Sequence, residues 1–426
     1  MTARYAALVL ACTLVACRAG EVPRTTAPPP RAATPATGLP NAEPAVRIGI
    51  TVDSASATVG ATGGFTIRAT GGDELARGRA GEAWTFTADE QGRVAARSPA
   101  GAVQPRPSLR VIPDAGSLLT IGGRQYRGEA LVVARGPNRL TAVNVVDLEQ
   151  YLLGVVPHEM GRLPANLIEA LKVQAVAART YAIGNLGSRS ASGFDFYATI
   201  MDQVYGGTAN EDTIVSRAVM ETRGEIMTYD GAPIIAYYSS TCGGETAAID
   251  ESWPSRAPQP YLRSVSDRIP NSEQYYCSTS NRFNWETRWT RDELLAVLRE
   301  TLRTHTGGTV TAVQRVTDVR VLGRGPSGRA TVRLVADGRS YDLRADSVRW
   351  VFRPRPGPAI LNSSRIYDLQ TTTADGAVNT LAIRGGGWGH AIGMCQVGAM
   401  GRARAGHRYD AILRAYYTGV ELRKLY

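Results

Sequence analysis

The chain has very little lysine. Only Lys172 and Lys424 occur among its 426 residues, so almost all of the 48 basic residues are arginines, and the formal net charge is +10 at pH 7. An arginine-rich surface suits an anionic polymer, because a guanidinium group pairs with a carboxylate through two hydrogen bonds. A GC-rich coding bias and a solvated surface explain the same composition, so charge alone assigns no partner. We find no nucleic-acid-binding motif and expect no nucleic-acid partner.

The start of the chain lacks an apolar run long enough to cross a bilayer. Residues 5–16 form an apolar run that is too short for a membrane-spanning helix. Arg4 precedes it, and it ends at Leu14-Val15-Ala16-Cys17, as is typical of a bacterial lipoprotein signal. We therefore predict a signal peptide over residues 1–17, lipidation of Cys17, and export to a membrane-anchored position. An ordinary secretory signal, in which Cys17 has no role, is the alternative.

The remaining sequence divides by composition. Residues 18–45 are rich in Pro, Ala and Thr and contain few core-forming residues, which predicts a solvated tether. Residues 46–146 contain short alternating apolar stretches broken by glycines, which predict a β-rich N-terminal lobe. Residues 147–426 mix helices and strands without a regular βαβ repeat, with a β-rich insertion at about 305–350. The predicted fold class is therefore α+β.

Two helices are expected on either side of a lone carboxylate. A short helix over residues 147–153 leads into a loop that holds Glu159, and an alanine-rich helix begins near Pro164 and ends at Gly184 to Gly187. Small alanines on its apolar face allow a neighbouring element to approach closely. An acid placed just before such a helix indicates catalysis, although an acid in that position also serves as a helix cap.

Three further segments have distinct patterns. Residues 233–240 read as a buried strand, and residues 291–303 as a helix capped by Thr290. Residues 385–398 contain too many glycines for a regular element, so we expect a tight loop that brings the backbone close to a ligand or to the loop at Cys242.

Four sequence blocks together resemble the SpoIID/LytB family, the stage II sporulation protein D type of peptidoglycan lytic transglycosylase and amidase enhancer. They occur in the family's order: Val155-Val156-Pro157-His158-Glu159-Met160 with residues 169–181, then Asp202-Gln203-Val204-Tyr205-Gly206-Gly207, then residues 238–244 with Thr246 and Trp253, and finally residues 387–399 followed by Ile412-Leu413 and Tyr416-Tyr417. The resemblance covers roughly residues 140–426. It implies a protein that faces the cell wall, in the periplasm or at the outer cell surface.

The resemblance implies that Glu159 is the general acid and base of a lytic transglycosylase. Such an enzyme cuts between N-acetylmuramic acid (MurNAc) and N-acetylglucosamine (GlcNAc) and leaves 1,6-anhydro ends. Many glycosidases use two carboxylates, whereas one suffices here because the sugar's own C6 hydroxyl replaces water. The acid must have a raised pKa to donate a proton near neutral pH. A preference for strands stripped of peptides is also implied by the resemblance.

Other residues of the blocks are expected to support catalysis. Arg179 is assigned to the cleft beside the acid, to bind a substrate carboxylate or developing charge, with a surface salt bridge as the alternative. Aromatic faces suit sugar rings, although each aromatic residue also fits a core position. The expected substrate-binding residues are Tyr181, Tyr205, Tyr238, His390 and Gln396.

Three cysteines remain after the signal peptide, which contains Cys12 and Cys17. Zinc prefers thiolate and imidazole ligands, and some members of the resembled family bind it through cysteines and a histidine. The zinc ligands would be Cys242, Cys277, Cys395 and His390. A disulfide between the first two of these cysteines is an equal alternative, because export favours disulfides, and unpaired thiols are the remaining one. No cofactor is expected to be required.

Two other functions compete with the transglycosylase. One is a non-catalytic protein that binds peptidoglycan or enhances a cell-wall amidase, which would make peptidoglycan glycan strands and an amidase its partners. The other is a hydrolase that uses Cys395 as nucleophile and His390 as base. Retention of Glu159 and Arg179 argues against the first, and the lack of a third orienting group argues against the second.

Overall fold

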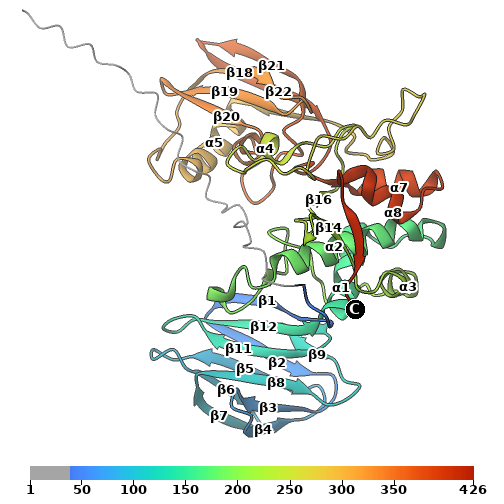
Figure 1. Cartoon of the computed structure of the whole chain (residues 1–426). Coiled ribbons are helices and arrows are strands. Elements are labelled where there is room, and N and C mark those ends of the chain that lie inside the picture. The colour runs from blue at the N-terminus through green and yellow to red at the C-terminus, as the bar shows by residue number, and fades with distance from the viewer. Residues whose placement is uncertain (1–38) are drawn as a thin grey trace, which may run out of the picture.

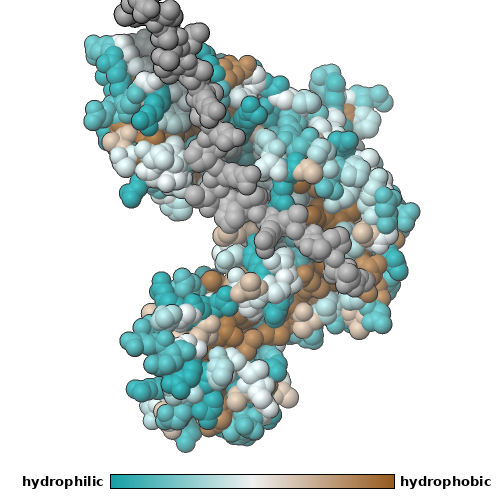
Figure 2. Space-filling model, turned by 60° about the vertical axis from the view of Figure 1, so that its left-hand side comes forward, coloured by the Kyte–Doolittle hydropathy of each residue, from teal (hydrophilic) through white to brown (hydrophobic). Residues whose placement is uncertain are grey.

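The structure is a computed structural model that describes residues 39–426. The predicted signal peptide with Cys17, and most of the predicted tether, lie outside the described residues. Figure 1 shows two strand-rich lobes with a helical body between them. In the space-filling view, the two lobes project to the same side and leave a hollow between them (Figure 2). None of the helices in the described part is both long and apolar enough to cross a membrane.

The N-terminal lobe consists of two antiparallel sheets with a shared core. Its strands are β1 (Ala45–Ser54), β2 (Ser56–Ala61), β3 (Phe65–Ala69), β4 (Glu74–Gly78), β5 (Ala83–Ala88), β6 (Val94–Ser98), β7 (Gly101–Arg106), β8 (Ser108–Pro113), β9 (Leu119–Ile121), β10 (Arg124–Tyr126), β11 (Glu129–Ala134) and β12 (Leu140–Asp147). The order of one sheet is β1-β12-β11-β8-β3-β4, with the short strand β13 (Phe196–Tyr197) added in parallel beside β1, and that of the other is β10-β9-β2-β5-β6-β7. In β5, Trp84 and Phe86 are buried while their neighbours are exposed, as strand periodicity requires.

The helical body surrounds one central helix, α2 (Ile168–Asn185). Around it lie α1 (Leu148–Met160), α3 (Thr213–Glu221), α7 (Gln396–Arg404) and α8 (Tyr409–Tyr416), all of which contact α2. Five alanines of α2 are fully buried, and their small side chains allow this close packing: Ala170, Ala175, Ala177, Ala178 and Ala182.

Short elements complete the helical body. They are the 3₁₀ turns η1 (Ala165–Leu167) and η2 (Ser190–Ser192), helix α4 (Ile249–Ser252), and strands β13 (Phe196–Tyr197), β14 (Glu225–Tyr229), β15 (Ala232–Pro233), β16 (Tyr238–Ser239), β23 (Met394–Cys395) and β24 (Glu421–Lys424). The single strand predicted over residues 233–240 is therefore wrong. Only Pro233, Tyr238 and Ser239 of this range lie in strands, and they belong to two short pairings in different sheets, β14–β15 and β16–β23.

Helix α1 is longer than the sequence pattern indicated. The expected helix over 147–153 continues to Met160, so Glu159 lies on the last turn of α1 and not in a loop. Pro157 lies inside this helix, and the N-terminal turns are buried against α2 and α3. Tertiary packing therefore outweighs the usual cost of an internal proline.

The second lobe has its own hydrophobic core, built from residues between 285 and 383. It contains β17 (Asn284–Thr290), α5 (Arg291–His305), β18 (Val316–Arg324), β19 (Ala330–Ala336), β20 (Arg339–Arg344), α6 (Ser347–Val351), β21 (Ile366–Ala374) and β22 (Ala377–Gly386). This lobe is wider than the insertion expected at 305–350, because α5 and the β17–β22–β21 sheet pack into the same core.

Helix α5 confirms the prediction made for residues 291–303. Thr290 accepts a hydrogen bond from the main chain of Glu293, whose side chain accepts one from the N–H of Thr290. This capping box satisfies two main-chain donors at the helix start. The N-terminal lobe is built of strands, whereas the helical body and the second lobe combine helices with separate sheets, so the fold is α+β, as predicted.

Candidate active site

Glu159 is the partly buried carboxylate at which three of the sequence blocks meet. Its Oε1 accepts a hydrogen bond of 2.7 Å from the main-chain N–H of Val204. Its Oε2 accepts one of 3.4 Å from Nε2 of Gln396. The same amide nitrogen lies 3.3 Å from Oε1 of Gln174, on α2. The carboxylate is therefore fixed by groups from two segments that lie far from it in the sequence.

A glycine lets the Val204 segment lie directly on helix α1. A Cβ at Gly154 would come within 2.6 Å of the Tyr205 ring and 2.7 Å of the Gly207 oxygen. The Gly154 carbonyl also accepts the N–H of Gly206 at 3.3 Å. Any larger residue at this position would push the segment away from Glu159.

Gln396 is positioned by the pairing of two short parallel strands. Tyr238 and Ser239 of β16 pair with Met394 and Cys395 of β23. The N–H of Val397 then donates to the Ser240 carbonyl at 3.0 Å. The third sequence block therefore sets the position of the fourth, and through Gln396 it reaches Glu159.

The surroundings of Glu159 favour the protonated acid. Burial raises the pKa of the Glu159 carboxyl, and the hydrogen bonds from Val204 and Gln396 lower it by less. A carboxyl group with a raised pKa retains its proton at a pH where an exposed glutamate has lost it. The group can therefore donate a proton to a leaving oxygen, and then accept one.

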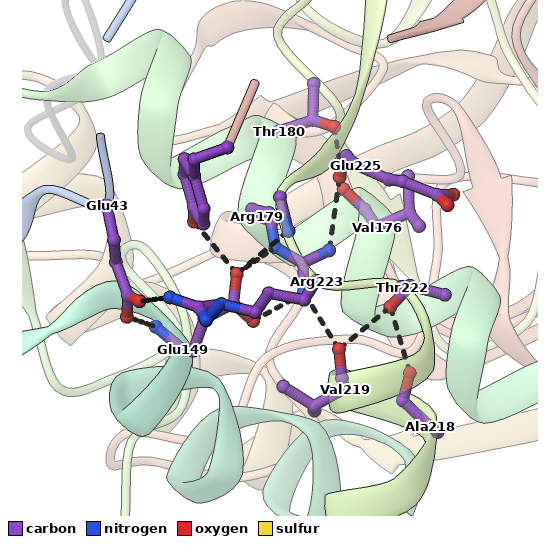
Figure 3. A network of polar contacts seen from close by, with 12 residues as sticks. Glu43, Glu149, Val176, Arg179, Thr180, Ala218, Val219, Thr222, Arg223 and Glu225 are labelled. Atoms are coloured by element: carbon purple, nitrogen blue, oxygen red, sulfur yellow. Dashed lines mark hydrogen bonds and ion pairs between the residues drawn. The ribbon is translucent and has the colours of Figure 1, made fainter. Parts of the chain in front are cut away.

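Arg179 lies in a buried ion pair (Figure 3). Its Nε and Nη2 donate to the two oxygens of Glu149 at 2.8 and 2.7 Å, and its side chain has no exposed surface. Its remaining hydrogen bonds go to the carbonyls of Val219 and Glu225. The catalytic role expected for Arg179 thus has no support in this geometry, since the guanidinium contacts other parts of the fold and not Glu159.

The Arg179 pair belongs to a larger network that ties the two ends of the described chain together. The Glu149 carboxylate also accepts from the Tyr426 hydroxyl at 2.8 Å and from the Gly224 N–H at 3.2 Å. The main-chain N–H of Glu149 donates to Glu43, which pairs with Arg223 (Figure 3).

Two of the three tyrosines expected to bind substrate, Tyr181 and Tyr205, are buried. The Tyr181 hydroxyl donates to Asp202 at 2.9 Å, and that of Tyr205 to Asn144 at 2.9 Å. The Tyr205 ring also packs against Tyr151, with 4.9 Å between centroids. Both residues fill the core with their hydroxyl groups satisfied, so neither presents a face to a sugar.

Tyr238 is partly buried and belongs to a polar chain that sequence reasoning missed. Its hydroxyl accepts from Nε2 of Gln203 at 2.9 Å, and Gln203 accepts from Tyr151. The carboxylate of Asp202, which precedes Gln203 in the sequence, accepts hydrogen bonds from the Tyr181 hydroxyl and the Tyr197 N–H, and it pairs with Arg189. These contacts hold the block that delivers the Val204 N–H to Glu159. The block itself was visible in the sequence, but its use of a main-chain donor was not.

His390 is held away from the cysteines. Its Nδ1 accepts the N–H of Ile392 at 3.0 Å, and its ring packs against Trp253 with 5.0 Å between centroids. Burial lowers the pKa of His390 to about 4, so the ring is neutral at physiological pH. Among the described residues, His390 makes no hydrogen bond with Cys395, so this geometry does not support the cysteine hydrolase.

Three cysteines and one acid form a buried cluster. One ligand atom from each of Cys242, Asp267, Cys277 and Cys395 lies within 4.8 Å of all the others. The three cysteines are free thiols, and the sulfurs of Cys242 and Cys277 are 3.6 Å apart, too far for a disulfide. The cluster therefore contains the three cysteines expected as ligands, but its fourth member is Asp267 and not His390.

Asp267 is oriented by two groups from the C-terminal helices. The Tyr416 hydroxyl donates to Oδ1 at 2.7 Å, and Arg402 lies 3.4 Å from the same oxygen. Burial, together with the nearby Cys242, raises the pKa of Asp267 to about 7. Sequence reasoning missed this acid because it lies in an irregular segment with no spacing pattern.

The glycine-rich loop contains one strained residue, Ala391, whose φ is 60°. Its N–H donates to the Ser239 hydroxyl at 3.1 Å, which fixes this conformation. A left-handed conformation is unfavourable for a residue with a Cβ.

Ala391→Gly is therefore expected to stabilise the protein by about 1 kcal/mol. The measurement is the midpoint of urea unfolding, which should rise. Ala399→Gly is the control of opposite sign: Ala399 lies in α7 and is fully buried, so glycine there should lower the midpoint. A lower midpoint for Ala391→Gly would show that the loop does not strain this residue.

The fold and the site define an α+β protein in which separate sequence blocks meet at one partly buried carboxylate, Glu159. A family model described as stage II sporulation protein matches residues 137–229, and one for a domain of unknown function, DUF8618, matches residues 247–393. An uncharacterized protein of Brachyspira hyodysenteriae is 32% identical over 304 residues, which are 71% of this chain and 73% of that protein.

Two relatives from Bacillus subtilis have descriptive names. Stage II sporulation protein D is 30% identical over 297 residues, 66% of this chain and 76% of its own length. The amidase enhancer is 29% identical over 342 residues, 74% of this chain but 47% of its own length, so this chain spans about half of that relative. The chain belongs to the SpoIID/LytB family.

Proposed function

We propose that this protein is a lytic transglycosylase that cleaves the bond between MurNAc and GlcNAc in peptidoglycan glycan strands. The observation that supports this most is the state of Glu159: partly buried, with a raised pKa, and held by Val204 and Gln396. Such a carboxyl can supply the single proton donor and acceptor that a transglycosylase reaction needs.

In the proposed mechanism, Glu159 serves both halves of the reaction. Its proton passes to the glycosidic oxygen as the bond to the anomeric carbon breaks, which leaves Glu159 as a carboxylate. The carboxylate then takes the proton from the C6 hydroxyl of the same MurNAc. That oxygen bonds to the anomeric carbon and closes the 1,6-anhydro ring, and Glu159 regains its proton. The N–H of Val204 and the Gln396 amide stabilise the carboxylate between the two transfers.

Product analysis tests this function. Purified glycan strands, with and without stem peptides, are incubated with the protein, and the products are analysed by mass spectrometry. Anhydro-MurNAc ends that increase with time support the proposal. Reducing ends alone would indicate a hydrolase, and an absence of cleavage would overturn the enzymatic proposal.

A non-catalytic role is the second candidate, because one relative is named amidase enhancer. In that case the protein would bind glycan strands and increase the rate of a cell-wall amidase without making anhydro ends. Amidase turnover measured with wild-type protein and with Glu159→Gln separates the two functions. Equal stimulation by both, with no anhydro product from either, would support the enhancer.

Gln396→Leu is predicted to change the pH dependence of cleavage. The alkaline limb of kcat/KM reports loss of the Glu159 proton, and in the wild type we expect it above the ordinary glutamate pKa of about 4.3. The Gln396 amide lowers this pKa, so removing it should move the limb to higher pH and lower kcat. Gln370→Leu, on the exposed strand β21, is the control and should leave the profile unchanged. An unshifted limb in Gln396→Leu would contradict the positioning role.

We further propose that the cysteine cluster holds a structural zinc ion. Three thiols and a carboxylate are ligands that zinc accepts, and the four ligand atoms already lie close together. The ligands would be Cys242, Asp267, Cys277 and Cys395. When bound, zinc would cross-link segments that are far apart in the sequence, and it takes no part in the proton transfers.

Elemental analysis should find about one zinc per chain, and Cys277→Ser should lose most of it. Titration of free thiols under denaturing conditions, with and without a chelator, is the matching measurement. Cys277→Ser should also have a lower unfolding temperature than the wild type, and a chelator should not lower it further. A chelator should lower the unfolding temperature of the wild type. Protein without zinc and with one free thiol outside the signal peptide would instead mean a disulfide.

We also propose that the protein is exported and anchored by lipid at Cys17, so that it faces the cell wall. The support is the sequence of residues 1–17, with its short apolar run that ends at a cysteine. Metabolic labelling with a fatty acid, compared between wild type and Cys17→Ala, tests the anchor. Equal labelling of the two proteins would rule it out.

A further inference from the structure

Two aromatic side chains are exposed around the glycine-rich loop. Six large apolar side chains of the described residues are well exposed: Ile200, Met201, Met220, Leu322, Tyr367 and Trp388. Only Tyr367 and Trp388 are aromatic, at 45% and 44% exposure. They lie close together in the fold, because a Cβ at Gly386 would meet the Tyr367 hydroxyl and Trp388 follows two residues later. An exposed pair of this kind is typical of a binding surface.

The backbone of Trp388 is held rigidly. Its N–H donates to the Thr241 carbonyl at 2.7 Å, and its own carbonyl accepts the Thr241 N–H at 3.0 Å. On one side, the Gly387 N–H bonds to the carbonyls of Arg282 and Phe283, and on the other the Gly389 N–H bonds to that of Asn362. The indole is therefore presented by a fixed main chain, which reduces the entropy lost when a ligand binds.

An unpaired arginine lies against the Trp388 indole. The guanidinium of Arg282 is 5.1 Å from the ring centroid, and Nη1 donates to Oδ1 of Asn362 at 3.1 Å. Arg282 is exposed, and it has no acidic partner among the ion pairs of residues 39–426. The stacked guanidinium is thus oriented, and its charge remains available to an anionic ligand.

The loop that contains Trp388 is connected to the candidate active site through one short segment, residues 239–241. Ser239 pairs with Cys395, the residue before Gln396, and two positions later Thr241 pairs with Trp388. Two residues of extended chain span about 7 Å. The Trp388 backbone therefore pairs with the same short segment as Cys395, and Cys395 is followed by the residue that contacts Glu159.

We propose that Trp388 and Arg282 form a subsite for a sugar that bears a carboxylate. The apolar face of the ring would pack on the indole, while the carboxylate accepts hydrogen bonds from the guanidinium. In a glycan strand, this sugar is a MurNAc whose lactyl carboxylate is free. The inference deepens the proposed function, because it identifies residues that select the substrate, and it rests on that function for the identity of the sugar.

Binding to an inactive protein tests the subsite separately from catalysis. All variants are made in the Glu159→Gln background, and affinity is measured by calorimetry with two probes. One probe is a peptide-free MurNAc–GlcNAc oligosaccharide, and the other is a neutral GlcNAc oligosaccharide of equal length. Trp388→Ala should weaken both by about tenfold, and Trp388→Phe should restore most of the affinity.

The charged and neutral probes distinguish the contribution of Arg282 from that of Trp388. Arg282→Gln should weaken the acidic probe by about tenfold and leave the neutral probe unchanged. Arg355→Gln, which replaces an exposed arginine of the second lobe, is the matched control and should affect neither probe.

The outcomes distinguish failure of the proposed subsite from failure of the proposed enzymatic function. Wild-type affinity for both probes in Trp388→Ala, or an equal loss for both probes in Arg282→Gln, would overturn the subsite even if the enzyme cleaves glycan. The expected pattern of binding would support the subsite even if the wild-type protein yields no anhydro ends, in which case only the enzymatic proposal fails.

Discussion

Glu159→Gln is expected to lower the rate of glycan cleavage by about 10²–10⁴-fold, with the fold retained. The amide fills the same space and can still accept the hydrogen bond from the Val204 N–H, but it has no proton to give to the glycosidic oxygen. The rate is measured as anhydro-MurNAc ends formed per minute on peptide-free glycan. Circular dichroism before the assay checks the fold.

The same substitution also has a predicted effect on stability. Burial raises the pKa of Glu159, so the folded protein binds this proton more tightly than the unfolded chain does. Its contribution to stability is then complete below the ordinary glutamate pKa and is lost as pH rises through the folded-state pKa. Glutamine has no charge to bury, so Glu159→Gln should match the wild type at acid pH and exceed it at neutral pH.

A surface glutamate supplies the matched control. The Glu273 side chain is 95% exposed, so Glu273→Gln should change neither cleavage nor the pH dependence of stability. Near-wild-type cleavage by Glu159→Gln would remove this carboxyl from the chemistry. A cleavage defect without any difference in the stability curves would show that burial does not raise its pKa.

The sequence identified the acid but not how it is held. Glu159 stood out because it lies in a recognisable block before an alanine-rich helix. Its two partners are a main-chain N–H and an amide 237 positions away, and neither leaves a local spacing pattern. Such contacts depend on tertiary packing, here on Gly154 and on the β16–β23 pairing, which local sequence cannot specify.

Sequence reasoning also confused core residues with site residues. Tyr181, Tyr205 and Arg179 belong to the same blocks as the acid, yet they are buried and bonded to other parts of the fold. Such a block can contain residues that build the fold as well as residues that bind substrate. The residue types alone do not separate these two roles. Burial and hydrogen-bond partners do.

The cysteine cluster and the acid are connected through neighbouring residues. Cys395 lies in the cluster, and the next residue, Gln396, contacts Glu159. The sulfur of Cys395 also accepts the N–H of Cys242 at 3.2 Å and that of Gly398 at 3.4 Å. The position of the Gln396 amide therefore depends on the cluster. If the cluster becomes disordered, the hydrogen bond from Gln396 to Glu159 should be weakened.

Arg179→Ala is expected to destabilise the protein by about 3–5 kcal/mol, because it leaves Glu149 buried without its partner. The loss would also free the carbonyls of Val219 and Glu225, at the point where α3 and β14 meet α2. The measurement is urea unfolding. Arg414→Ala, which breaks an exposed pair with Asp410, is the control and should cost less than about 1 kcal/mol.

Arg179→Lys separates a structural role from a catalytic one. Lysine keeps the charge but cannot donate two parallel hydrogen bonds to Glu149, so we expect it to be destabilised while enough protein remains folded for assay. If Arg179 acts only through the fold, the cleavage rate per folded molecule should stay within a few-fold of the wild type, and its pH profile should be unchanged. A folded Arg179→Lys with a large loss of kcat would instead restore Arg179 to the reaction, because the Glu149 pair would then have to open when substrate binds.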